Sequence, residues 1–93
     1  MIKSFRDTET EKVFERRFSR RLPNDMQSVA LRKLRMISNA VDVNDLRSPP
    51  ANRLEKLHGD REGQYSVRVN DQWRICFAWR GGDAFDVEIC DYH

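Results

Sequence analysis

The chain has 93 residues, of which 39% are hydrophobic and 34% charged, and only seven are Gly or Pro. This composition is typical of one small ordered domain and excludes a disordered or fibrous chain. Because the sequence contains no apolar run of membrane-spanning length and no signal-peptide pattern, we expect a cytoplasmic protein without a membrane partner.

The net charge of +2 conceals an uneven distribution. Residues 1–41 contain ten Lys or Arg and five acidic residues, whereas residues 42–93 contain seven and ten. This asymmetry indicates a basic surface in the first part of the chain. Cys76 and Cys90 are too few for a disulfide framework and lack the further ligands of a zinc site, so we expect free thiols and no metal.

The first 21 residues predict a short strand followed by a helix. Residues 2–5 alternate weakly, as a strand would. Thr8 and Glu11 then have the spacing of a capping box, in which each side chain satisfies an unpaired backbone donor at the start of a helix. We therefore expect a helix from Thr8 through residue 21, with an apolar stripe formed by Val13, Phe14 and Phe18.

A second helix should follow Pro23. Asn24 and Gln27 have the spacing of another capping box, and apolar residues then recur at helical spacing through residue 40. Two helices with so short a link should form an antiparallel hairpin. Residues 41–53 should be irregular, because two consecutive prolines at 49 and 50 cannot continue a helix.

From residue 54 the hydrophobic period changes from 3.6 to 2, which is typical of strands. Residues 54–57 suit a short strand, and residues 58–64 contain the turn-forming residues of a loop. Three antiparallel strands should then occupy residues 65–69, 73–79 and 84–90. The predicted fold class is therefore α+β, with two N-terminal helices on a mainly antiparallel sheet, in a single domain of residues 1–93.

The first of the two expected hairpins has a register that follows from its apolar residues. A three-residue loop of residues 70–72 pairs Val69 with Trp73 and keeps the apolar side chains on one face. The same register sets Arg68 opposite Arg74. The other face of the sheet then carries Arg68, Arg74, Cys76, Glu88, Cys90 and, just beyond, Tyr92.

For the second hairpin we expect a three-residue turn of residues 81–83. It sets Trp79 opposite Phe85, and the same pairing places Ile75 opposite Ile89. A two-residue turn would place Phe77 opposite the acidic residue 86 and mix the two faces, so the longer turn is favoured.

Two arginines paired on an open sheet face need an explanation, because like charges directly opposite each other are destabilising. A polyanion bound between Arg68 and Arg74 would provide one, since guanidinium groups match phosphate oxygens and stabilise charge that develops during cleavage. Alternatively, Glu88 and nearby acids neutralise the pair while the arginine stems cover the sheet. Both interpretations are open at this point.

Other residues offer weaker signals. The chain ends in Asp91, Tyr92 and His93, which could transfer protons or stack on a base, or could form a solvated tail. His58 begins the loop that also carries Arg61, and a lone loop histidine is more often simply solvated. The basic residues Arg16, Arg17, Arg20 and Arg21 could follow a nucleic-acid backbone, bind an acidic protein or form a solvated helix face.

The block "GDREGQYSVRVNDQWRICF" and the terminal "DYH" resemble the HigB toxins of bacterial toxin-antitoxin pairs, a branch of the RelE-like superfamily also known as the plasmid maintenance system killer family. The resemblance extends from the opening "MIKSF" to the last residue. It implies a RelE-like α+β fold and a ribosome-dependent endoribonuclease, or mRNA interferase, that cuts messenger RNA in the ribosomal A site without cofactor or metal.

The resemblance also implies partners: a cognate HigA-type helix-turn-helix antitoxin, the ribosome with its mRNA, and operator DNA through the antitoxin. It assigns Arg68 and Arg74 to the scissile phosphate. Arg61, in the loop at the edge of the arginine face, is a further candidate for RNA binding from its place in the sequence. Tyr92 would orient the base or phosphate, and His93 or Asp91 would transfer the proton. Many relatives have Lys where this chain has His58, which departs from the family pattern. His58 could replace the charge of that lysine when protonated, or act as acid or base itself. A non-cleaving module that binds RNA, ribosome or antitoxin is the alternative.

Overall fold

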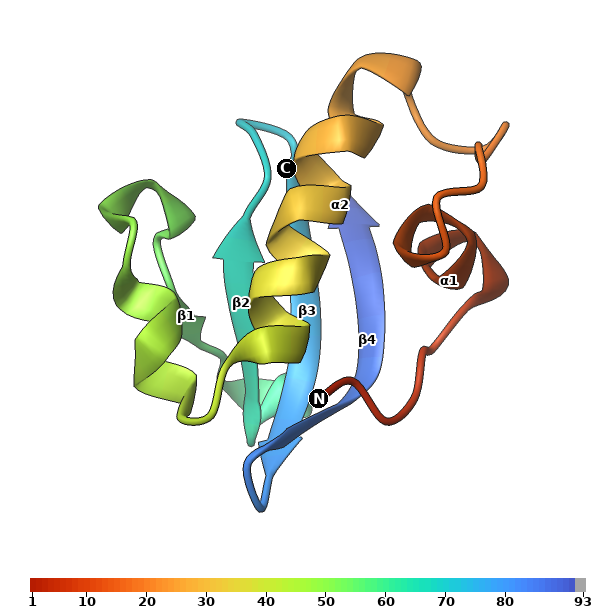
Figure 1. The fold of residues 1–93 in the computed structure, drawn as a ribbon. Coiled ribbons are helices and arrows are strands. Elements are labelled where there is room, and N and C mark those ends of the chain that lie inside the picture. The colour runs from red at the N-terminus through yellow and green to blue at the C-terminus, as the bar shows by residue number, and fades with distance from the viewer. Residues whose placement is uncertain (92–93) are drawn as a thin grey trace.

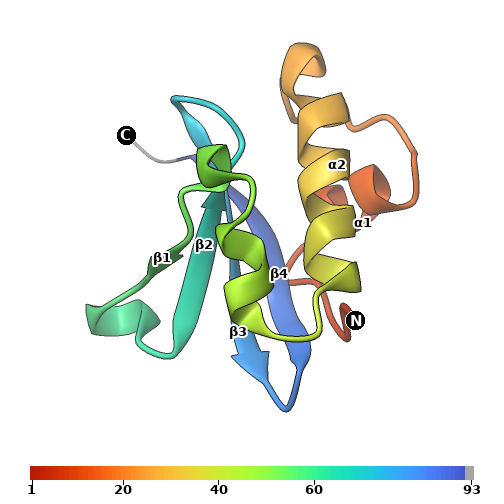
Figure 2. The same ribbon diagram turned by 60° about the vertical axis from the view of Figure 1, so that its left-hand side comes forward.

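The computed structural model describes residues 1–91 and shows a four-stranded antiparallel sheet with both helices on one side (Figure 1). The strands lie in chain order, β1 (Glu55–Lys56), β2 (Gln64–Arg68), β3 (Trp73–Arg80) and β4 (Asp83–Asp91). The helices are α1 (Thr8–Phe14) and α2 (Asn24–Asn39), and Figure 2 shows them on the same side of the sheet. Three short 3-10 helices, η1 (Val43–Arg47), η2 (Pro50–Asn52) and η3 (Gly59–Arg61), lie in the connections. The expected α+β architecture is confirmed.

The core lies between α2 and the sheet. The alternating residues Val67, Ile75 and Phe77 are buried on the face that α2 covers. From α2 itself the buried apolar residues are Met26, Ala30, Leu34 and Ile37, which recur at helical spacing. The sequence periodicity therefore identified the core face of α2, β2 and β3. None of the helices within residues 1–91 is long and apolar enough to cross a membrane.

Helix α1 is half as long as expected. Asp7, and not Thr8, is its N-cap, because its carboxylate accepts a hydrogen bond from the Thr10 amide at 2.7 Å. The helix ends at Phe14, and Arg16 has a left-handed backbone with φ of 65°. Residues 15–21 therefore leave the helical path, and Phe18 is 60% exposed although the sequence predicted it in the core.

Helix α2 begins at Asn24 without the expected capping box. Pro23 is the N-cap and no side chain caps the helix. The Gln27 amide instead donates to the carbonyls of Ser19 at 2.7 Å and Leu22 at 2.9 Å, and its oxygen accepts from the Ser19 amide. Gln27 therefore fixes the segment between the two helices.

Residues 2–5 do not form the continuous strand that the sequence suggested. Ile2 and Phe5 make isolated parallel bridges to Ala84 and Val87 of β4. Between them, Ser4 Oγ accepts a hydrogen bond from the amide of Asp86 at 2.9 Å. The N-terminal segment thus lies along part of the outer edge of β4.

The register of the first hairpin is confirmed, and the turn of the second was wrong. Arg68 pairs with Arg74 as expected. In the second hairpin Arg80 pairs with Asp83, so two glycines, both with positive φ, form the turn. Trp79 consequently lies opposite Ala84 and not opposite Phe85 as predicted. A β-bulge then adds one residue to β4 between the partners of Cys76 and Ala78.

Asp86 lies in this bulge and has φ of 54°. The extra residue changes the alternation, so Val87 is fully buried and Ile75 still opposes Ile89 as predicted. In a regular strand a two-residue turn would mix the two faces of the sheet. The bulge removes that conflict.

We expect the left-handed backbone of Asp86 to decide which substitutions this position tolerates. Asp86→Gly should leave the free energy of unfolding unchanged or raise it by up to about 1 kcal/mol. Asp86→Val should lower it by about 1–2 kcal/mol, because a β-branched residue is strained at positive φ. Urea denaturation measures both, with Asp86→Asn as the control. Equal stability of the Val and Gly variants would contradict the assignment.

Candidate functional site

Arg74 is buried and does not lie on an open face. Only 8% of the residue is exposed. Its Nε donates to Ser66 Oγ at 2.8 Å, and one terminal nitrogen donates to the Arg53 carbonyl at 2.6 Å. Arg68, opposite it, points to the hairpin loop, where its guanidinium forms an ion pair with Asp71. The two charges are thus held by different partners, which explains how the sheet accommodates the pair.

The carbonyl that receives Arg74 is supplied by an unusual backbone. Arg53 follows η2 with φ of 44° and ψ of 57°, in the left-handed region. The preceding residue, Asn52, is 1% exposed and donates to the Leu46 carbonyl at 3.2 Å. Asn52 Oδ1 also accepts a hydrogen bond from Lys33 Nζ at 2.5 Å. A buried network on α2 and η2 therefore fixes the carbonyl that orients Arg74.

Burial lowers the pKa of Lys33, because a low-dielectric environment disfavours the charged ammonium. The positive charges of Arg32 and Arg68 act in the same direction. Lys33 carries a charged side chain, yet only 5% of the residue is exposed. Lys33 of helix α2 therefore interacts electrostatically with Arg68 of β2.

The arginines converge on a pocket of about 320 Å³, which we call the arginine pocket. Three arginines and two carboxylates are among its lining residues, which are Arg53, Glu55, Arg68, Asn70, Asp71 and Arg74. Asn70 shapes the loop, because its side-chain oxygen accepts hydrogen bonds from the amides of Gln72 and Trp73. The net formal charge of the lining is +1, from three arginines minus two acids, which suits an anionic ligand.

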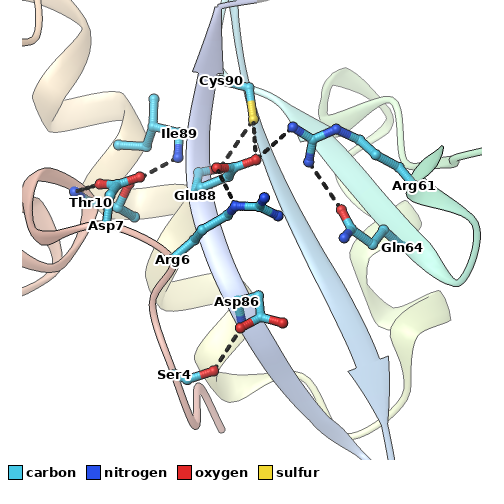
Figure 3. Close-up of polar contacts among 10 residues, drawn as sticks. All are labelled: Ser4, Arg6, Asp7, Thr10, Arg61, Gln64, Asp86, Glu88, Ile89 and Cys90. Carbon is cyan, nitrogen blue, oxygen red and sulfur yellow. Dashed lines mark hydrogen bonds and ion pairs between the residues drawn. The ribbon is translucent and has the colours of Figure 1, made fainter.

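Glu88 is the second charged centre on this side of the sheet (Figure 3). Arg61 of η3 reaches across to it with an N–O distance of 2.7 Å, and Arg6 of the N-terminal segment lies at 3.5 Å. The hydrogen bond to Glu88 raises the pKa of Arg61. Glu88 therefore neutralises arginines, as one of the two sequence interpretations proposed, but the arginines are Arg6 and Arg61.

The two cysteines are free thiols, as expected. Cys76 is fully buried, and the Cys90 thiol donates to a Glu88 carboxylate oxygen at 3.3 Å. Contact with Cys76, burial and the carboxylate of Glu88 all raise the pKa of Cys90. These contacts disfavour the thiolate form of Cys90. Within residues 1–91 no cluster of three or more His, Cys, Asp or Glu side chains could hold a metal ion.

The remaining predicted site residues are dispersed. Asp91 ends β4, opposite Trp73, and accepts a hydrogen bond from Gln72 at 3.2 Å, outside the pocket lining. His58 precedes η3 near Gln64, at the opposite end of β2 from Arg68, and does not line the pocket. Tyr92 and His93 lie outside the described residues. The exposed Arg16, Arg17, Arg20 and Arg21 belong to the segment between the helices.

The sequence reasoning missed Glu55 and Arg53. Glu55 begins β1, its side chain is 55% exposed, and a carboxylate oxygen lies 3.8 Å from the guanidinium of Arg74. A carboxylate beside fixed positive charges can accept a proton while the arginines hold an anion. The sequence signal for this strand was weak, because β1 has only two residues and so shows no clear alternation of apolar and polar positions. Only the pairing of Glu55 with Ser66 brings it next to Arg74.

We expect the two arginines to differ sharply in their contribution to stability. Arg68→Ala should change the free energy of unfolding by less than about 0.5 kcal/mol, because its ion pair is with the fully exposed Asp71. Arg74→Ala should lower it by about 2 kcal/mol or more, because buried hydrogen-bond partners lose their donor. Urea denaturation of both variants checks this. A large loss in Arg68→Ala would show that Arg68 is structural.

Among solved structures, the chain is similar to the toxin-antitoxin complex "YoeB-YefM complex from Staphylococcus aureus". The match has a TM-score of 0.62 and 21% identity, and covers 100% of this chain and 98% of that one. A second YoeB-YefM structure, a heterotetrameric complex from the same organism, gives the same TM-score at 20% identity. At these identities the likeness shows the fold alone, which is the arrangement of two helices on an antiparallel sheet that the sequence predicted.

Comparison with curated proteins and family models gives the family. Toxin HigB-1 of Vibrio cholerae is 38% identical over 90 residues, which cover 96% of this chain and 95% of that protein. Endoribonuclease HigB of Proteus vulgaris is 33% identical over 93 residues, which cover both chains completely. The family described as "RelE-like toxin of type II toxin-antitoxin system HigB" matches residues 3–93. This chain therefore belongs to the HigB family of RelE-like toxins.

Proposed function

We propose that this protein is a toxin that cleaves messenger RNA in the ribosomal A site, so that translation stops, and that a cognate HigA-type helix-turn-helix antitoxin neutralises it. Membership of the HigB family and a relative named an endoribonuclease support this proposal. The observation that carries it is the arginine pocket, where Arg68 and Arg74 lie beside the carboxylate of Glu55. Action on the ribosome implies a cytoplasmic location.

In this proposal the scissile phosphate binds in the arginine pocket. Arg74 supplies a charge that is already oriented by Ser66 and the Arg53 carbonyl, so little reorganisation accompanies the reaction. Arg68 can exchange the exposed carboxylate of Asp71 for a phosphate oxygen, because that pair lies at the solvent boundary. Together they stabilise the negative charge that develops on the phosphate.

The chemical step in this proposal is attack by the messenger's own 2′-hydroxyl on the adjacent phosphorus. The attack requires a base for the hydroxyl proton and an acid for the leaving 5′-oxygen. Glu55 is our candidate for the base, because it lines the pocket beside Arg74. His93 or Asp91 remains a candidate for the second proton transfer, and Tyr92 for stacking on a base. His58 would act only if the bound RNA extends to the far end of β2.

A reconstituted translation reaction tests the proposal. We expect purified ribosomes with a defined messenger and this protein to give cuts within A-site codons, mapped by primer extension. Arg68→Ala should slow cleavage by about 10²-fold or more, because one phosphate contact to the developing charge is lost. Arg80→Ala is the matched control, since Arg80 is an exposed arginine at the far end of β3 that stacks on Phe85 and does not line the pocket.

The candidate proton-transfer groups separate in the same assay. Glu55→Gln should slow cleavage by about 10²-fold or more and remove the acidic limb of the pH–rate profile if Glu55 is the base. Asp91→Asn and a chain that ends at Tyr92 test the other candidates. A folded protein that binds ribosomes or antitoxin but never cuts would instead support a non-cleaving binding module.

A further inference from the structure

The segment between the two helices holds an exposed aromatic ring in a fixed position. Phe18 is 60% exposed, yet its neighbour Ser19 is fully buried. The Ser19 hydroxyl donates to Glu9 of α1, and Gln27 of α2 binds both the amide and the carbonyl of Ser19. Together with the left-handed backbone of Arg16, these contacts present Phe18 to solvent instead of folding it into the core. A single exposed apolar residue is ordinary, whereas one that adjoins further apolar surface marks a candidate binding surface.

Phe18 borders a groove of about 500 Å³ between the end of α1 and the outer face of α2, which we call the Phe18 groove. Leu31 contributes further apolar surface, and Val13 also lines the groove but is only 3% exposed. The groove shares no lining residue with the arginine pocket. It is therefore a second site, built from different elements.

The charged residues that line the groove are all positive. Arg16, Arg17 and Arg35 line it and no acidic residue does. Arg17 forms an ion pair with Glu15 at 2.9 Å, whereas neither Arg16 nor Arg35 has an ion pair or side-chain hydrogen bond to another residue in 1–91. The groove thus combines an apolar floor with positive charges that the described part of the chain leaves largely unmatched.

We propose that the Phe18 groove binds an acidic amphipathic segment of the partner antitoxin. Apolar residues on one face of that segment would cover Phe18 and Leu31, while Asp or Glu on its flanks would pair with Arg16 and Arg35. The phosphates of an RNA could also pair with these arginines, which is the nucleic-acid alternative that the sequence left open. The apolar surface favours a protein, because a phosphate backbone gains nothing from covering Phe18 and Leu31. The proposal rests on the proposed function only in taking the partner to be the antitoxin.

Affinity for the antitoxin encoded with this toxin tests the proposal. Phe18→Ser and Arg35→Glu, each in the full chain, should weaken its binding at least about tenfold in titration calorimetry. Val41→Ser is the control for the first variant, because Val41 is 81% exposed and lies outside the groove. Arg32→Glu is the control for the second, because Arg32 is exposed on the same helix and does not line the groove. Both controls should change the affinity less than about twofold.

A photo-crosslinker at position 18 identifies what covers the groove. The expected product is an antitoxin peptide in which acidic residues flank apolar ones. Unchanged antitoxin affinity in both groove variants would overturn the proposal, as would loss of ribosome or RNA binding with antitoxin binding intact. The experiment measures affinity for the antitoxin, so it tests the groove even if the protein does not cleave RNA. If cleavage does occur, the groove variants should retain it in the absence of antitoxin.

Discussion

The buried guanidinium of Arg74 is the interaction on which the candidate site depends. A charge that is 92% removed from solvent needs partners, and this one has Ser66 on β2 and the carbonyl of Arg53 after η2. Those partners require β1 and the connection before it to lie against β2. The left-handed backbone of Arg53 and the buried Asn52 follow from that requirement. The irregular segment before the sheet is thus as important to the site as the strands are.

Arg68 and Arg74 look equivalent in the sequence, but this arrangement gives them different roles. Arg74 is fixed by the fold before any ligand arrives, whereas the side-chain partner of Arg68 within residues 1–91 is the exposed Asp71. A fixed charge lowers the reorganisation needed when a phosphate reacts, and an adjustable one allows the phosphate to enter. Glu55 completes the set from the short strand β1. Three strands therefore each contribute one charged group to the arginine pocket.

The parts of the fold governed by regular periodicity were predictable. Alternation over residues 65–79 fixed the first hairpin register, because a slip by one residue would expose Val67, Ile75 and Phe77. The bulge at Asp86, the early end of α1 and the buried position of Lys33 were not predictable, because each depends on partners distant in sequence. The same limit applies to the site. The arginine pair followed from the register, but Glu55 becomes part of the pocket only through tertiary pairing.

The N-terminal segment has a consequence for the order in which this chain folds. The hairpins join residues that are near in sequence, whereas the hydrogen bond between Asp86 and Ser4 closes a loop across 82 positions. Closing a long loop costs more chain entropy than closing a short one, and its contacts are rewarded only once β4 has formed. The meander of β2, β3 and β4 should therefore form first. Residues 2–5 would then dock as a late step, and their amides should exchange with solvent sooner than those of β3 in the native protein.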